Sequence, residues 1–492
     1  MTTLEVAGRT ATGPRIGEST PRPDGVPKVT GSFAFSSDLH HDRMLWGGTL
    51  RSPHAAARIR GVDIGPALAL AGVYAVLTHE DVPGSPTYGL IQRDQPVLAS
   101  DVVRYEGEAV VVVAADHPDT VRRALAAIQV DWEPTEPLVN PELAADAAPI
   151  HPDGNVIRRI HLRHGDQAAA DGHDLVSVEG TYEVGMQDQA FLGPESGLAI
   201  PDEDGGVDLY VATQWLHEDR DQVAACLGLP EDKVRLTLAG VGGAFGARED
   251  LSLHVHLCLL ALRTGRPVKM SYGREESFHG HVHRHPARMH YRHLATTEGD
   301  LVRVEARLLL DGGAYASSSS AVISNATCFA VGPYRVPSVE IEGVVVRTDN
   351  PPCGAMRGFG AVQTCFAHEA QMDRLAIALG MDPVDLRLRN ALEPGDRLPT
   401  GQVITGTLPV AEVLRACAGH PSAAVGPDDP MARPGGAGRT ADVDDVVRGE
   451  AVAVGFKNLM FSEGFDDPSS ARCVLHHGVA TITCACAEVG QG

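Results

Sequence analysis

The alternation of apolar and polar residues along the chain predicts a mixed α/β protein. Strand patterning recurs in four N-terminal segments, at residues 46–51, 73–78, 102–115 and 128–132. The third ends in a continuous valine run, which is typical of a strand buried on both faces. Asp116 is placed to cap a helix over 117–127. We therefore expect one α/β unit over residues 25–140, entered through a loop at 26–31.

A second and larger unit is predicted over residues 175–420, after a polar connector at 141–174. Apolar residues at three- and four-residue spacing predict helices over 218–227, 250–263, 365–379 and 383–391. Strands are predicted between them at 234–238, 268–272 and 301–309. Interleaved helices and strands again indicate an α/β arrangement.

The C-terminal part of the chain predicts a third unit that is incomplete. Residues 421–448 are rich in Ala, Gly, Pro and Asp, which indicates a flexible linker. Strand patterning resumes over 449–492 and then the sequence ends. Cys484 and Cys486 alternate within this last stretch and share one face, so we expect them to be small core residues.

Composition narrows the possible partners. The chain has 492 residues, of which 43% are hydrophobic and 21% charged, as in folded globular proteins. A formal charge of -23 argues against nucleic acid or an anionic membrane surface as the main partner. The longest apolar runs fall well short of the roughly 18 residues that a membrane span needs. The N-terminus lacks the apolar stretch of a secretory signal, so we expect a cytoplasmic protein.

Cysteine and histidine patterns give little support to a metal site. None of the nine cysteines forms a Cys-x-x-Cys pair, which argues against a zinc ribbon or an iron–sulfur cluster in this chain. His281, His283 and His285 alternate and so share one strand face. They could bind a metal, but no carboxylate stands at a clear spacing from them. We therefore favour an exposed strand and loop.

Two glycine-rich loops carry the candidate chemistry. In residues 240–249 the third glycine of a dinucleotide fingerprint would fall on Phe245, so the loop is not that motif. Its backbone N–H groups can still approach a ligand closely, beside Glu249. The loop at 353–363 places Arg357 and Phe359 among glycines, which suits an anionic group and a planar ring. Each loop alone could equally be a structural turn.

The order of these motifs closely resembles the molybdenum-binding large subunit of the xanthine dehydrogenase/aldehyde oxidase family. The resemblance is carried by Thr213-Gln214, then Gly242-Gly243 to Gly246 with Glu249, then Arg357-Gly358-Phe359, and finally Gly490-Gln491-Gly492. It covers nearly the whole chain. It implies an N-terminal α/β hammerhead domain, a first molybdopterin-binding domain and the start of a second one.

The resemblance also implies roles for single residues around the molybdenum. Those that match the family's cofactor-contacting and metal-pocket positions are Gln214, Phe245, Gly246, Arg357, Gly358 and Gln491. Gln214, Phe245 and Arg357 would lie next to the molybdenum ligands. Glu249 matches the glutamate that binds a purine, and Phe359 one of two aromatic residues that sandwich it. The second aromatic position falls near Met460 or Phe461.

On this basis we expect oxidation of hypoxanthine and xanthine toward urate, by hydroxide attack and hydride transfer to a molybdenum-sulfido centre. The cofactor would be molybdenum-molybdopterin, in its cytosine dinucleotide form. Electrons would pass to 2Fe-2S and FAD centres on partner subunits. An aldehyde or other N-heterocycle oxidoreductase of the same family, and a catalytically incompetent truncated fragment, are the alternatives.

Two departures from the family pattern bear on the substrate and on activity. Purine oxidisers usually have an arginine about 32 residues before the Arg-Gly-Phe-Gly motif, where this chain has Asn325. A neutral amide cannot supply the positive charge that stabilises charge building on the substrate. The family's general-base glutamate belongs to a C-terminal segment that this sequence does not contain, and we expect Glu488 to be structural.

Overall fold

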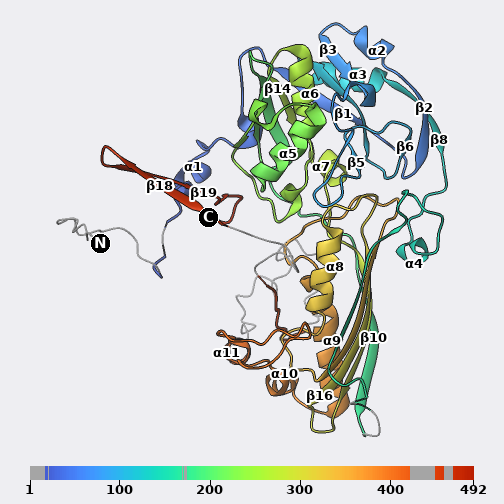
Figure 1. Cartoon of the computed structure of the whole chain (residues 1–492), viewed down its shortest axis with the longest axis vertical. Helices are drawn as coiled ribbons and strands as arrows, with labels where there is room; N and C mark the ends of the chain where they lie inside the picture. Colours follow the sequence, from blue (N-terminus) through green and yellow to red (C-terminus); the bar gives the residue numbers. More distant parts are fainter. Residues whose placement is uncertain (1–16, 20, 169, 171–173, 421–448, 459–468) are drawn as a thin grey trace, which may run out of the picture.

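The computed structural model describes residues 17–19, 21–168, 170, 174–420, 449–458 and 469–492. Two large sheets dominate this part of the chain (Figure 1). The first has seven strands in the order β13 (Val234–Leu238), β12 (Val207–Val211), β11 (Ser196–Pro201), β14 (Val268–Ser271), β1 (Leu45–Arg51), β7 (Ala109–Ala115) and β3 (Val73–Leu77). This sheet joins strands from the first two predicted units, whose boundaries remain predictions.

Three helices pack on the seven-stranded sheet: α3 (Pro118–Ala127), α5 (Leu216–Leu227) and α6 (His254–Thr264). Helix α6 is hydrophobic nearly all round, and its residues Val255 to Ala261 are all buried. The valine run of β7 is likewise buried on both faces. A helix and a strand without a polar face have to lie inside the protein. Here α6 and β7 contribute to the hydrophobic core around the seven-stranded sheet.

The second sheet has five strands in the order β10 (Val176–Val184), β15 (Ala287–Ala295), β16 (Leu301–Asp311), β17 (Ser338–Val346) and β9 (Val156–His164). Helices α8 (Ser319–Cys328) and α9 (Ala361–Leu379) cover one face (Figure 1). Met289, Leu308 and Ile341 from the strands meet Met372 of α9 in that core. The covered face explains why alternate residues of these strands are apolar.

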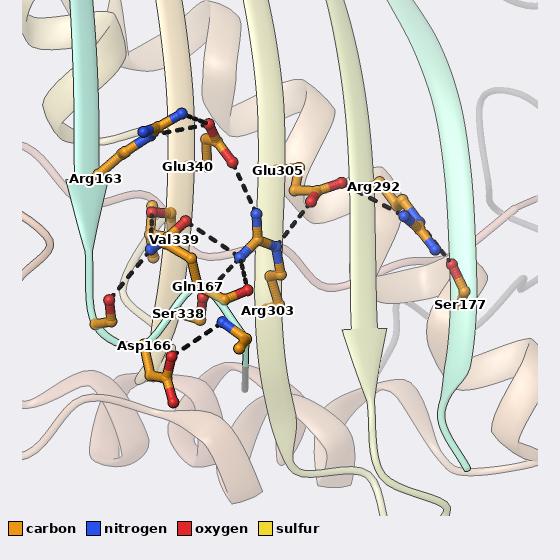
Figure 2. Close-up of polar contacts among 12 residues, drawn as sticks. Arg163, Asp166, Gln167, Ser177, Arg292, Arg303, Glu305, Ser338, Val339 and Glu340 are labelled. Carbon is orange, nitrogen blue, oxygen red and sulfur yellow. Dashed lines mark hydrogen bonds and ion pairs between the residues drawn. The ribbon is translucent and has the colours of Figure 1, made fainter. Parts of the chain in front are cut away.

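The opposite face of the five-stranded sheet is a ladder of charges (Figure 2). The Arg303 guanidinium donates to Glu305 and Glu340, each at 2.7 Å, and to Ser338 Oγ at 3.2 Å. It also donates to the Gln167 carbonyl oxygen at 2.7 Å. The pair of Arg303 with Glu340 joins β16 to β17, and cross-strand pairs of opposite charge stabilise neighbouring strands.

Smaller elements complete the described chain. A three-stranded sheet holds β6 (Val102–Val103), β2 (Ala57–Asp63) and β8 (Gln129–Pro134), and two hairpins hold β4 (Thr87–Tyr88) with β5 (Gln95–Pro96) and β18 (Ala471–His476) with β19 (Val479–Cys484). The other helices are α1 (Gly25–Thr30), α2 (Gly65–Leu68), α4 (Pro141–Ala144), α7 (Arg274–Gly280), α10 (Pro383–Asn390) and α11 (Val410–Ala418). None of the described helices is long and apolar enough to cross a membrane.

The predicted strand at 234–238 and the helices at 218–227 and 383–391 are confirmed within a few residues. Two strands, β6 and β7, replace the single one expected over 102–115. The loop expected at 26–31 is helix α1, which Gly31 ends with a φ of 76°. A proline in the first turn is compatible with a helix, and the glycine is a favourable C-cap.

Three other sequence predictions are wrong. Helix α3 is capped by His117, whose Nδ1 accepts from the Asp119 N–H at 3.1 Å, and not by Asp116. The expected connector contains strand β9, because its apolar residues alternate well enough to pair with β17. Cys484 and Cys486 are exposed, since β19 pairs only with β18 among the described strands. The linker predicted at 421–448 lies outside the described residues.

One stability prediction arises at the start of α10. The Asp382 side chain accepts from the N–H groups of Val384 at 2.8 Å and Asp385 at 3.1 Å. Asp382→Ala is expected to lower the free energy of unfolding by about 1 kcal/mol, measured by urea denaturation of the purified chain. Asp382→Asn keeps a capping oxygen and is the control. Equal losses in both variants would contradict the capping role.

Candidate active site

The two glycine-rich loops lie against each other. The Arg357 N–H donates to the Phe245 carbonyl oxygen at 2.8 Å. Gly246 has a φ of 106°, and a Cβ placed on it would stand 2.7 Å from the Ala355 carbonyl carbon and oxygen. Only glycine allows this approach, because it lacks a Cβ and tolerates positive φ. Two segments that are far apart in sequence therefore form one surface.

Both phenylalanines of these loops have a strained backbone. Phe245 has a φ of 54° and Phe359 a φ of 48°, which non-glycine residues seldom adopt. The Phe245 ring is exposed, whereas Phe359 packs against the core under α8 and α9. Strain of this kind persists only where the surrounding structure holds it, and it is concentrated at functional sites.

A cavity of about 1150 Å³ opens at the junction of the two loops. Every predicted site residue in the described chain lines it, namely Gln214, Phe245, Gly246, Glu249, Arg357, Gly358, Phe359 and Gln491. A volume of this size accommodates a cofactor together with a small substrate. The structure thus brings together residues from four separate stretches of sequence.

Gln214 is held by the first loop so that its amide nitrogen stays available. Its Oε1 accepts from the Gly246 N–H at 3.0 Å, and its own backbone N–H donates to the Arg248 carbonyl oxygen at 2.9 Å. The amide assignment follows from the first contact, because a backbone N–H needs an acceptor. The side-chain NH₂ therefore remains as a donor on a residue that lines the cavity.

The C-terminal segment returns to the cavity wall. Val489 packs beside Ala212, Val241 and Ala244, and Gly490 lies near Gly243. The Gln491 amide is used within its own turn, since Nε2 donates to the Ala487 carbonyl oxygen at 2.7 Å and Oε1 accepts from the Val489 N–H at 2.8 Å. Gln491 can therefore meet a ligand through its backbone or only after its side chain moves.

Glu488 anchors this segment to the N-terminal part of the chain. Its carboxylate accepts from Arg22 at 3.0 Å and from the Gly490 N–H at 2.8 Å, and Lys28 lies 3.9 Å away. These contacts are consistent with the structural role expected for Glu488. Arg22 and Lys28 line the same cavity, and both are ion-paired with Asp24 as well.

Glu249 is the carboxyl group of the cavity. It ends a short 3-10 turn (Ala247–Glu249), and its Oε2 is buried without a hydrogen-bond partner among the described residues. Burial raises the pKa of the Glu249 carboxyl to about 8; the neighbouring Asp250 adds to the rise and Lys457 opposes it. At neutral pH the group is therefore mainly a neutral acid that can donate one hydrogen bond and accept another.

The sequence also singled out Asn325, Met460 and Phe461, none of which is among the described residues that line the cavity. Asn325 is fully buried in α8, where neither its Oδ1 nor its Nδ2 has a hydrogen-bond partner in the described chain, and it does not line the cavity. Met460 and Phe461 lie outside the described residues. Sequence reasoning missed Lys457, which lines the cavity and faces Glu249. One indication in the sequence that Lys457 belongs to the site is its place three residues before Met460.

The histidine run is buried, which corrects the expectation of an exposed strand and loop. His281, His283 and His285 are all less than 9% exposed. Of these three, His283 alone pairs as a strand would, through a single bridge to Cys353. All three side chains are covered by other parts of the fold, which an alternating pattern cannot reveal.

The chemistry of the cavity fits an anionic, oxygen-rich cofactor. Within the described chain the Gln214 NH₂ is a free donor, and the Arg357 guanidinium makes no ion pair or side-chain hydrogen bond there. Glycines 242, 243 and 246 leave backbone close to the cavity without side chains in the way. Donors that lack protein acceptors are what oxo and phosphate groups require.

Comparisons with known proteins identify the family of this chain. Residues 150–391 match the model of the molybdopterin cofactor-binding domain, and residues 30–136 match the aldehyde oxidase and xanthine dehydrogenase a/b hammerhead domain. The chain is 41% identical over 401 residues to the nicotinate dehydrogenase large molybdopterin subunit of Eubacterium barkeri, covering 81% of this chain and 94% of that protein.

Other relatives are longer than this chain. It is 39% identical over 403 residues to a probable xanthine dehydrogenase subunit of Bacillus subtilis, covering 81% of this chain and 54% of the relative. The solved aldehyde oxidoreductase from Desulfovibrio gigas superposes with a TM-score of 0.77 at 30% identity, over 81% of this chain and 46% of that protein. The chain thus belongs to the xanthine dehydrogenase and aldehyde oxidase family and contains its hammerhead and molybdopterin cofactor-binding domains.

Proposed function

We propose that this chain is the cofactor- and substrate-binding part of a molybdenum hydroxylase that oxidises an aromatic N-heterocycle, with xanthine and hypoxanthine as the substrates. The observation that carries the proposal is the Glu249 carboxyl on the cavity wall, whose Oε2 is buried without a hydrogen-bond partner in the described chain and whose pKa is raised by burial to about 8. A neutral acid can donate to a ring nitrogen and accept from a ring N–H at once. An aldehyde offers no such pair of groups.

Each residue around the cavity has a task in this proposal. When bound, the molybdenum cofactor supplies the oxygen nucleophile and the two-electron acceptor of the hydroxylation. Gln214 donates its NH₂ to an oxygen of the cofactor, and Arg357 places positive charge beside it. Glu249 orients the heterocycle, and Phe359 supports its ring face. Positioning of this kind removes the entropy cost of aligning substrate and cofactor.

We further propose that electrons leave through iron–sulfur and flavin centres on partner chains, and that the pterin carries the cytosine dinucleotide. The proposal of partner chains is supported by two relatives, in Eubacterium barkeri and in Bacillus subtilis, which are both described as subunits. Affinity purification through this chain, followed by iron, flavin and nucleotide analysis, tests the proposal. Recovery of active enzyme containing this chain alone would contradict it.

Nicotinate is the second candidate substrate. Lys457 and Arg357 line the cavity together with Glu249, so a carboxylate on the heterocycle could meet a cation. The 41% identity to a nicotinate dehydrogenase subunit points the same way. If nicotinate is the substrate, Lys457→Met should raise KM for nicotinate and leave KM for hypoxanthine nearly unchanged.

The substrate class is tested by steady-state turnover of the native complex, purified through a tag on this chain. Hypoxanthine, xanthine, nicotinate and benzaldehyde are each assayed over a range of concentrations that gives kcat/KM. Turnover of a purine with the highest kcat/KM supports the leading proposal, and the highest value for nicotinate supports the second. Turnover of benzaldehyde alone would overturn both.

The raised pKa of Glu249 predicts an alkaline limit on purine oxidation. Because the neutral acid is the donor, kcat/KM for hypoxanthine should fall as pH rises through about 8 and stay level just below it. In Glu249→Gln the donor does not ionise, so this part of the pH profile should disappear. Ionisation of hypoxanthine itself affects the wild type and Glu249→Gln equally. Identical pH profiles of kcat/KM for these two proteins would contradict the prediction.

A further inference from the structure

Beside the cavity lie three side chains of types that ligate metal ions, Asp188, His281 and His283. The Asp188 Oδ2 atom lies 3.0 Å from His281 Nε2 and 3.5 Å from His283 Nε2. All three ligand atoms lie within 4.8 Å of one another. The two imidazoles stack, with ring centroids 5.1 Å apart. The sequence showed no carboxylate at a clear spacing from these histidines, whereas the fold brings Asp188 to them.

These distances suit a shared metal ion. Ligand atoms about 2.0–2.1 Å from a tetrahedral zinc ion are separated by about 3.3 Å. The two oxygen–nitrogen distances fall on either side of that value. The imidazole side chains are 2% and 5% exposed and the Asp188 side chain 14% exposed, so water is largely excluded.

The surroundings of His281 resemble those of a metal-bound histidine. Its Nδ1 faces Glu195 Oε1 at 3.2 Å, and the Glu195 side chain is 3% exposed. A carboxylate on the second ring nitrogen holds a ligating imidazole in place and makes it a better ligand. Glu195 Oε2 and His283 Nδ1 are buried without a hydrogen-bond partner in the described chain.

A protonated His281 between the two carboxylates is the competing explanation. It accounts for the contacts of Asp188 and Glu195, but it leaves His283 Nε2 directed at the same Asp188 oxygen without a reason. A divalent cation between the three side chains accounts for the contacts of both imidazoles with Asp188.

We propose that Asp188, His281 and His283 bind one first-row divalent metal ion, best matched by zinc, at a site separate from the molybdenum cofactor. Gln189 Oε1, 3.2 Å from His281 Nε2, is placed to take the fourth position. The role is structural, because three or four protein ligands in a closed, buried site leave no place for a substrate.

The position of this site indicates what the ion would stabilise. The His281 ring lies beside the ring of Phe191, with the two ring centroids 5.2 Å apart, and Phe191 lines the cavity. Gln189 donates through Nε2 to the Ala355 carbonyl oxygen at 2.9 Å, and Arg284 donates to the Arg357 carbonyl oxygen at 3.0 Å. The ion would therefore fix the two segments that support the arginine-containing loop.

The test is elemental analysis of the full chain, purified in its native complex without added metal. We expect about one zinc or other first-row metal per chain besides molybdenum and iron. His283→Gln should lower this content about tenfold or more, and Asp188→Asn should do the same. His285→Gln is the matched control, because that buried histidine bonds Ser319 Oγ at 2.8 Å and does not face Asp188.

A second measurement does not depend on any variant folding. After treatment with a chelator, the wild-type protein is titrated with Zn²⁺ alone, and its melting temperature should rise by several degrees at saturation. Saturable binding at about one ion per chain supports the site. No additional metal in the purified protein together with no thermal shift on adding Zn²⁺ would overturn it. So would equal metal content in wild type and His283→Gln.

Discussion

Glu249→Ala is expected to lower kcat/KM for hypoxanthine by about 100-fold or more, the usual effect of removing a hydrogen bond made to the transition state in a site that excludes water. The alanine also leaves the heterocycle's buried N–H without an acceptor, which adds the cost of desolvating it. Oxidation of benzaldehyde should change much less, because this substrate has no ring nitrogen to pair with. The measurement is steady-state turnover with both substrates.

Two further variants make this result specific. Glu249→Gln keeps a neutral donor and acceptor at the same place, so it should retain more purine turnover than alanine does. Glu218, which is exposed on α5 and does not line the cavity, provides a control in Glu218→Ala. Equal losses for hypoxanthine and benzaldehyde would show that Glu249 maintains the cavity rather than recognises the heterocycle. The proposed role would then fail, and the family membership would stand.

Gly246→Ala is expected to remove most of the bound molybdenum, lowering its content by about tenfold or more. The new Cβ would lie 2.7 Å from the Ala355 carbonyl group on a residue with a φ of 106°, so the two loops must separate. Backbone strain of about 1–3 kcal/mol adds to that clash, and about 1.4 kcal/mol already corresponds to a factor of ten in binding. Gln214 also loses its contact with the Gly246 N–H when the loop moves.

Gly265→Ala is the matched control for this variant. Gly265 also has a positive φ, 61°, but nothing lies within 4 Å of a Cβ placed there. Both substitutions carry backbone strain, whereas only Gly246→Ala forces the loops apart. Molybdenum content of the purified proteins, measured beside their circular dichroism spectra, separates loss of cofactor from loss of fold. Equal molybdenum content in the two variants would contradict the proposed role of the loop contact.

Short motifs, taken together as a resemblance to a family, predicted the residues of the candidate site. Gly246 and Arg357 lie in motifs whose order and spacing are visible in the chain itself, and the structure brings both to one cavity with Gln214 and Glu249. The mixed fold was predictable for a similar reason. Apolar periodicity is a local property, so strand β13 and helix α10 could be located without knowing their partners.

What the pattern of residues could not show depends on contacts between distant segments. Asp188 lies far before His281 in the chain, and only the packing of one segment on the other places its Oδ2 within 3.5 Å of two imidazole nitrogens. Tertiary structure likewise brings Lys457 into the cavity wall, where its charge opposes the rise in the pKa of Glu249. Burial, and the pKa shifts that follow from it, are properties of the assembled surroundings. The sequence therefore determined the loops, the periodic elements and the family, whereas the tertiary structure decided which groups share a cavity and which charges lie away from water.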